Sequence, residues 1–491
     1  MAVTLKRKAV QFDPDHGRVI ARFFMPGDEN RGRAIIERVL ALAAKEQMLI
    51  FNHVFRQFSG RHRNLTRVLE ENFKRVEHLL DPLTVKGETL SKEIQYVIGA
   101  YFTKEFSIES AAFFNPSIVE DPYQGSLQEN QKRIILSFRA TGEGHVSSLV
   151  FRSGVVDEHN DFHIDPVGDS VDVPEIITRH EYEKRRFLAK LTEMHIKDDA
   201  ISLVMDPLGE HFNYGELQGA IAQTLKIQDL SHTCRKVVEA INWLARSHYE
   251  VTFSLDTAIC DRVLFPVSFS ESNGIEDARF VRFVEEDQAV TYYATYTAFD
   301  GYAILPKLIA TDDFYHFKIM PIHGENVQNK GLALFPRRIK GKYAMLSRMD
   351  GINNYLMLSE EITLWNSARR ILGPQHPWEF VQVGNAGSPL ETEHGWLVVT
   401  HGVGPMRTYS LGAMLLDLDD PTKVVAHLKH PLLVANEKER EGYVPNVVYS
   451  CGSIIHNHEL IIPYAMSDYS STVACVPLDE LFDELLGTGK R

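Results

Sequence analysis

Two adjacent carboxylates, Glu276 and Asp277, have the setting in this chain that is best suited to chemistry. They stand with Arg279 in the segment Gly274–Phe280, just before an aromatic, alternating run over residues 292–301. A carboxylic acid beside flat apolar side chains has a tunable pKa and a surface on which a pyranose ring can rest. This arrangement predicts a site that cleaves a glycosidic bond.

The composition is that of an ordinary globular protein. Of its 491 residues, 44% are hydrophobic and 24% are charged, and the formal net charge of -14 argues against nucleic-acid or membrane partners. The first twelve residues hold no apolar run typical of a secretory signal, and no segment has the length of a membrane span, so we expect a cytoplasmic protein. The four cysteines (Cys234, Cys260, Cys451, Cys475) and 21 histidines show no ligand spacing. We therefore expect reduced buried thiols, no metal and no cofactor.

Short alternating runs separated by turn residues predict strands from about Ala111 onward. The clearest runs are residues 133–139, 291–297, 342–348, 396–401 and 459–464. Apart from one long gap they recur at intervals of roughly 50 to 60 residues, which is typical of a β-propeller. The polar or aromatic residues at the ends of the inner strands are then expected to converge on one pocket: Arg139, Arg348, His401 and Tyr464.

Helical periodicity marks two other regions of the chain. Apolar residues recur at helical spacing from Gly32 to Leu80, with Asn64 as a candidate N-cap, which predicts an N-terminal helical hairpin. A second helical region, about residues 178–250, fills the long gap and is expected to pack with the N-terminal helices. The expected organisation is a helical region over residues 1–95 and a propeller catalytic domain over residues 96–491 that contains the helical insertion.

Several polar motifs follow one another in an order that resembles glycoside hydrolase family 130. They are Asn115–Val119, Phe138–Ala140, Gly274–Arg279, Asn329–Pro336, Gly384–Pro389, His401–Val403, Tyr409–Ala413, Leu415–Pro421, Glu441–Gly452 and Tyr464–Asp468. The resemblance extends from about Ala111 to the C-terminus and leaves out the helical insertion. It implies a mainly β fold, a five-bladed β-propeller that acts on β-linked mannosides.

The resemblance also implies a mechanism. Most members of the family are phosphorylases that release α-mannose 1-phosphate, and a minority are hydrolases. Asp277 is the implied proton donor, acting through the 3-hydroxyl of the sugar, while inorganic phosphate attacks the anomeric carbon from the opposite face with inversion. Phosphate is thus a co-substrate, and no carboxylate base is needed.

The resemblance assigns roles to further residues. Asn115, Arg139 and Asp468 are expected to hold the mannosyl ring, and Glu276, Asn329 and Lys330 are counted with them as substrate-binding residues. Arg348, His401 and Tyr409 are expected to line the phosphate position, and Arg407 is added because it stands close to Tyr409. One departure is Gln382, which stands where family phosphorylases usually carry a lysine or arginine, so one expected cation is missing.

The sequence leaves alternatives open. An inverting β-mannosidase would use water and a carboxylate base, for which Glu379 and Glu391 are candidates, and a carbohydrate-binding propeller would have no catalysis. Arg348, His401 and Asp468 also have structural readings, as an ion-pair partner, a turn cap and a turn residue. The substrate is expected to be a mannobiose, a β-1,2-mannooligosaccharide or a mannosyl-glucose, with Trp378 a candidate for the acceptor position. Apolar stripes on the helices make a homo-oligomer a further hypothesis.

Overall fold

The structure, a computed structural model, describes residues 3–80, 90–177, 181–194, 196, 200–227, 231–327 and 329–488. Strands make up most of its regular elements, which confirms the prediction of a mainly β fold. None of the helices among the described residues combines the length and the apolar character that crossing a bilayer requires.

The chain begins with strands, not with helices as the expected helical region over residues 1–95 implied. β1 (Lys6–Phe12) pairs with β29 (Ser470–Pro477), the last strand of the chain, and β2 (Asp15–Phe23) pairs with β3 (Thr103–Glu109). The N-terminal residues are therefore joined by backbone hydrogen bonds to the C-terminal sheet.

The N-terminal region contains more helices than the predicted helical hairpin. The helices of this region are α1 (Glu29–Ala41), α2 (Ala44–Phe58), α3 (Leu65–Lys74), the short η1 (Glu77–Leu79) and α5 (Lys92–Tyr101). Asp28 caps α1 by accepting a hydrogen bond from the Arg31 N–H, whereas Asn64 precedes α3 with a φ of 58° and makes no cap hydrogen bond with its side chain. These helices share a hydrophobic cluster of their own.

The first large sheet consists of two antiparallel meanders. One contains β4 (Ala112–Glu120), β5 (Lys132–Thr141), β6 (Ser147–Val156), β7 (Phe162–Ile164) and β12 (Val263–Leu264). The other contains β13 (Gly274–Val284), β14 (Val290–Phe299), β15 (Ile304–Thr311), β16 (His316–Pro321), β11 (Tyr249–Thr252) and β8 (Glu175–Ile177). The two are joined through a single parallel pair, Gly274 with Ser147.

Three smaller sheets follow in chain order. The first contains β17 (Ala333–Leu334), β18 (Tyr343–Ser347), β19 (Asn354–Ser359) and β20 (Ala368–Leu372). The second contains β21 (Gln382–Asn385), β22 (Leu390–Thr392), β23 (Gly395–Val403), β24 (Tyr409–Leu416) and β25 (Val424–His427). The third contains β26 (Val448–Tyr449), β27 (Ile454–His456), β28 (Glu459–Met466), β29 and β1.

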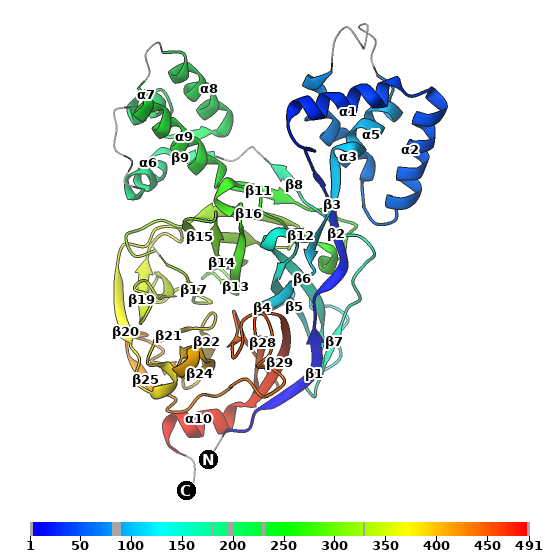
Figure 1. The fold of residues 1–491 in the computed structure, drawn as a ribbon. Coiled ribbons are helices and arrows are strands. Elements are labelled where there is room, and N and C mark those ends of the chain that lie inside the picture. Colours follow the sequence, from blue (N-terminus) through cyan, green and yellow to red (C-terminus); the bar gives the residue numbers. More distant parts are fainter. Residues whose placement is uncertain are drawn as a thin grey trace.

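The sheets follow one another around a common centre, and α10 (Leu478–Leu486) lies at the end opposite the two groups of helices (Figure 1). Buried clusters join neighbouring sheets, for example Trp396 and Val398 of β23 with Leu346 of β18. The remaining short helices are η2 (Glu143–His145), η3 (Ile259–Asp261), η4 (Phe269–Glu271), η5 (Pro377–Glu379) and η6 (Pro405–Arg407).

The helical insertion forms a separate unit. Its elements are β9 (Glu181–Glu183), α6 (Lys184–Glu193), α7 (Ala200–Met205), β10 (His211–Asn213), α8 (Tyr214–Leu225) and α9 (His232–Arg246). They share one hydrophobic cluster, distinct from that of the N-terminal helices, and the two groups stand apart in Figure 1. The expectation that the insertion packs with the N-terminal helices was therefore wrong.

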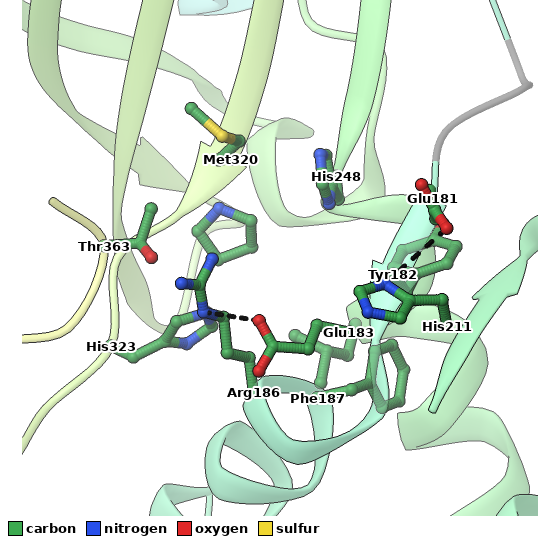
Figure 2. Close-up of a pocket in the computed structure, with 12 residues that line it drawn as sticks. Glu181, Tyr182, Glu183, Arg186, Phe187, His211, His248, Met320, His323 and Thr363 are labelled. Atoms are coloured by element: carbon green, nitrogen blue, oxygen red, sulfur yellow. Dashed lines mark ion pairs between the residues drawn. The ribbon is translucent and has the colours of Figure 1, made fainter. Parts of the chain in front are cut away.

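The insertion is attached to the sheets instead. Lys190 Nζ donates to the Ile322 carbonyl at 3.0 Å, and Arg186 pairs with Glu361 at 2.9 Å. At this junction lies a cavity of about 260 Å³, drawn in Figure 2, where side chains of the insertion such as Glu183 and Arg186 face His323 and Thr363. None of the residues that line it belongs to the predicted site.

Candidate active site

Asp277 and Asn115 both stand at irregularities in otherwise regular strands. The pairing of β13 with β14 shifts between Glu276 and Arg279, and that of β4 with β5 shifts between Phe114 and Ser117. At these bulges Asp277 has a φ of 54° and Asn115 a φ of 50°. Such conformations cost energy for residues other than glycine and are concentrated at functional sites. Here they turn both side chains toward each other, and Asn115 Nδ2 donates to Asp277 Oδ1 at 2.7 Å.

Two cations bind the carboxylate pair from either side. Arg139 donates to Glu276 Oε1 at 2.7 Å and lies 3.5 Å from Asp277 Oδ1, while Lys330 Nζ contacts Glu276 Oε2 at 2.5 Å. Arg139 is itself held by Ser147 Oγ at 3.0 Å and lies over the ring of Phe114. Glu276 therefore links Arg139 to Lys330, and it leaves the outer face of Asp277 open, with 20% of that side chain exposed.

The charges around Asp277 favour the ionised form of its carboxyl. Burial on its own raises the pKa of Asp277, but the Arg139 charge, the Asn115 hydrogen bond and the charges of Arg279 and Lys330 outweigh burial, so the pKa is lowered. A small cavity of about 10 Å³, room for about one water molecule, adjoins Asp277, Arg279 and Asn329.

Asp468 is a third carboxyl of the site, and its pKa is shifted in the direction opposite to that of Asp277. It lies in the turn between β28 and β29 with a φ of 51°. Burial, followed by the negative charge of Asp277, raises the pKa of Asp468 to about 6, although Arg139 and Arg407 act in the other direction. The two carboxyls are thus close enough to influence each other, and their pKa values are driven apart.

Arg348, His401 and Tyr409 form a second group. His401 Nδ1 lies 2.9 Å from the Asn385 carbonyl, which can only accept, so Nε2 is the acceptor for Arg348 at 3.3 Å. Burial, and then the charges of Arg348 and Arg279, lower the pKa of His401, which fixes the neutral form. The rings of His401 and Tyr409 are stacked with centroids 6.2 Å apart. The Nε of Arg348 is buried and has no hydrogen-bond partner among the described residues.

Arg279 connects the two groups, although the sequence did not predict it as a site residue. Its guanidinium is buried and donates to Asn385 Oδ1 at 2.6 Å and to the Tyr449 hydroxyl at 2.5 Å. Burial raises the pKa of Tyr449, and the charges of Arg279, Asp277 and Arg348 also influence it. Charged residues from both groups therefore lie close enough to the Tyr449 hydroxyl to affect its ionisation. Tyr449 belongs to the polar motif Glu441–Gly452, from which no site residue was predicted; its position in that motif was the available signal.

The remaining predicted residues differ in their proximity to these groups. Asn329 lines the cavity beside Asp277, and Gly331 holds the backbone close to Arg279 and Arg348. Arg407 follows Met406 in the turn between β23 and β24, and its charge acts on Asp468. Tyr464 does not join the site as expected: it is fully buried, and its hydroxyl donates to Glu439 at 2.7 Å.

The two carboxylates considered as bases lie elsewhere. Glu391 forms an ion pair with Arg337 at 2.6 Å, and it lies opposite Trp396 at the start of β23. His401 is five residues further along this strand, so at about 3.3 Å per residue the two positions are roughly 16 Å apart. Glu379 packs against Gly402 of β23, on the face toward which a side chain at that position would point. Because successive residues of a strand point to opposite faces, Glu379 lies on the face of β23 away from His401.

Known proteins resemble this chain over much of their length. The model of glycoside hydrolase family 130, described as β-1,4-mannooligosaccharide phosphorylase, matches residues 248–486. A 1,2-β-oligomannan phosphorylase of Thermoanaerobacter sp. is 34% identical over 218 residues, covering 43% of this chain and 71% of that protein. A β-1,2-mannobiose phosphorylase of Listeria innocua is 30% identical over 253 residues, covering 49% of this chain and 68% of that protein.

A solved structure is also similar. It is the complex of β-1,2-mannobiose phosphorylase from Listeria innocua with β-1,2-mannobiose, which matches with a TM-score of 0.46 and 22% identity over 77% of this chain and 93% of that chain. From the family model and the curated relatives, we conclude that the chain belongs to glycoside hydrolase family 130.

Proposed function

We propose that this protein is an inverting phosphorylase of β-mannosides, which releases α-mannose 1-phosphate and a shortened acceptor. The curated relatives support this reaction, because their names include 1,2-β-oligomannan, β-1,2-mannobiose, β-1,4-mannooligosaccharide and 4-O-β-D-mannosyl-D-glucose phosphorylases. The substrate proposed here is correspondingly a mannobiose, a mannooligosaccharide or a mannosyl-glucose.

The balance of charge in the site is the observation that carries this proposal. Arg139 and Lys330 are matched by the carboxylates of Glu276 and Asp277. In the described part of the chain no carboxylate lies within ion-pair distance of Arg279 or Arg348, whose partners are Asn385, Tyr449 and the neutral His401. Two unmatched guanidinium groups, that of Arg279 buried and that of Arg348 partly buried, suit a phosphate dianion, and they offset the cation that is missing at Gln382.

The proposed mechanism divides the chemistry between the two groups. Asn115, Arg139, Asp468, Asn329 and the Glu276–Lys330 pair would hold the mannosyl ring over the open face of Asp277. The carboxylic acid of Asp277 would pass its proton through the sugar 3-hydroxyl to the glycosidic oxygen. Phosphate held by Arg279, Arg348 and Tyr409, with Arg407 at the rim, would attack the anomeric carbon from the other side and invert it. His401, whose Nε2 accepts from Arg348, would orient that guanidinium toward the phosphate.

This mechanism needs Asp277 to gain a proton that the free site withholds. The surrounding cations lower the pKa of Asp277, and a bound phosphate dianion would oppose them, because a nearby negative charge disfavours the carboxylate. Phosphate would then have two roles, as nucleophile and as the charge that prepares the acid.

A hydrolase has less support from the geometry. An inverting hydrolase requires a carboxylate base across the sugar from the acid, about 6.5–9.5 Å away. Glu391 is paired with Arg337 at the far end of β23, and Glu379 is buried on the opposite face of that strand from His401. Neither carboxylate of the sequence-based alternative is therefore placed to activate a water molecule.

The test is incubation with β-1,2-mannobiose, β-1,4-mannobiose and mannosyl-glucose, with and without inorganic phosphate. We expect mannose 1-phosphate from at least one of them only when phosphate is present. Mannose released at the same rate without phosphate would instead establish a hydrolase. Binding of the disaccharide without any turnover would establish the non-catalytic alternative.

We also propose that the sheets form a five-bladed propeller. Five groups of antiparallel strands support it: β4–β7, β13–β16, β17–β20, β21–β25 and β26–β29. Among the described residues, the strand pairing between the first two is the pair Gly274 with Ser147. β1 completes the last group by pairing with β29, which joins the two ends of the chain in one sheet.

A further inference from the structure

Three side chains outside the proposed sugar site, His376, Glu379 and His427, come together on the sheet formed by β21–β25. Each offers one ligand atom, and these atoms all lie within 4.8 Å of one another. His376 is the N-cap of η5, Glu379 is the last residue of η5, and His427 is the last residue of β25, so two distant segments of the chain supply them.

The carboxylate of Glu379 is fixed in position but only half satisfied. Its Oε1 accepts from the backbone N–H groups of Gln375 at 2.8 Å and His376 at 3.2 Å. Its Oε2 lies 3.3 Å from His427 Nε2, in a geometry that does not make a hydrogen bond. In the described part of the chain, Glu379 Oε2 and both ring nitrogens of His427 have no hydrogen-bond partner.

These unsatisfied atoms are deeply buried. The side chain of Glu379 is 0% exposed and that of His427 is 5% exposed. Leaving a carboxylate oxygen and an imidazole without partners away from water is costly, so such groups are normally paired or bound to a metal. Ligand atoms around a tetrahedral zinc ion at about 2.0–2.1 Å lie roughly 3.3 Å apart, which is the separation found between Glu379 and His427.

We propose that His376, Glu379 and His427 bind one divalent transition-metal ion of the zinc type, with water as the remaining ligand. Two imidazoles and one carboxylate are a donor set that suits zinc and disfavours magnesium and calcium. His376 provides the third ligand. It is only partly buried, so the ion can enter the site from its side. The two backbone bonds to Glu379 Oε1 orient the carboxylate so that Oε2 faces the ion.

Such an ion would connect η5 to β25 behind the strand that carries His401. Trp378, between His376 and Glu379 in the chain, packs on Gly402 and Gly412, where an added Cβ would come within 2.4 Å and 2.6 Å of its ring. The ion would thus stabilise the packing of this sheet, independently of whether the sugar chemistry proposed above is correct.

The experiment is metal binding to the full chain, stripped with a chelator and carrying no affinity tag. We expect about one zinc ion per chain after gel filtration, a tetrahedral-type visible spectrum with Co²⁺, no uptake of Mg²⁺, and a higher melting temperature with zinc. His376→Ala and Glu379→Gln should each weaken zinc binding by about 10-fold or more.

The matched control is His159→Ala, which removes an exposed histidine elsewhere in the chain and should bind zinc like the parent. His376 is partly exposed, so its substitution tests the ligand without opening the core. Should Glu379→Gln fail to fold, the Co²⁺ spectrum of the parent chain and the His376→Ala titration still decide. The proposal is overturned if the parent chain takes up no zinc, or if His376→Ala binds it as tightly as the parent.

Discussion

Asn115 and Asp277 are 162 positions apart in the chain, yet a hydrogen bond of 2.7 Å joins them, and both have a left-handed backbone. The same two side chains are the sugar-binding residue and the proton donor of the proposed mechanism. The two strained residues thus lie at bulges in neighbouring strands, and the bulges direct the acid and its hydrogen-bond donor toward each other.

Replacing Asp277 by Asn should remove turnover and leave the fold intact. The amide oxygen can still accept from Asn115, but an amide N–H is not acidic enough to be transferred, so the rate should fall by about 10²–10⁴-fold. The measurement is mannose 1-phosphate release, with thermal unfolding as the check on folding. A variant that kept more than about a tenth of the parent rate would show that another group supplies the proton.

Replacing Arg348 by Ala should weaken phosphate binding selectively. A charge-assisted hydrogen bond contributes about 1.5–3 kcal/mol, so KM for phosphate should rise by about 10- to 100-fold. KM for the mannoside should change little. Arg337→Ala, which removes a surface guanidinium paired with Glu391, is the matched control and should alter neither constant. Equal effects on both substrates would place Arg348 in the sugar site.

Phosphate should shift the pH dependence of the reaction. The cations around Asp277 lower its pKa in the free site, and a bound dianion should raise it. The acid acts only when protonated, so kcat falls as pH rises through its pKa in the complex. The alkaline limb of the kcat profile should therefore lie at higher pH with saturating than with limiting phosphate, and identical limbs would contradict this role of the anion.

Asp468→Asn should stabilise the protein at alkaline pH. Folding raises the pKa of Asp468 from 3.8 to about 6, so the carboxyl favours the folded state below pH 3.8 and this contribution is lost as pH rises through 6. An uncharged amide avoids that loss. The variant should melt about 2 °C or more above the parent at pH 8, with a smaller difference at pH 5. The same difference at both pH values would show that ionisation is not the cause.

The N-terminal helices should mediate self-association. α2 has no buried residue, and Met48 and Leu49 are 44% and 60% exposed, so this face can be covered by a second copy. Size-exclusion chromatography with light scattering should give a mass above that of one chain, and Leu49→Glu should return it to a monomer. A parent chain that is monomeric at all concentrations would rule this out.

The local sequence pattern determined most of the strands and helices of this protein. The runs at 133–139, 291–297, 396–401 and 459–464 fall in strands, and the run at 342–348 extends one residue beyond β18 at each end. The agreement is close because alternation with a period of two can be recognised within one segment. The periodicity of the insertion likewise predicts its helices, and the residue types around Asp277 predict sugar chemistry without reference to any tertiary contact.

Only the tertiary structure decided which side chains meet. The left-handed backbone at Asn115, Asp277 and Asp468, the buried link from Arg279 to Tyr449, and the pairing of β1 with β29 depend on segments far apart in the chain. The cluster of His376 and His427, two histidines with uninformative spacing, is of the same kind. Periodicity records whether a residue faces a core, whereas the register and closure of the sheets set its neighbours, and no single segment encodes these.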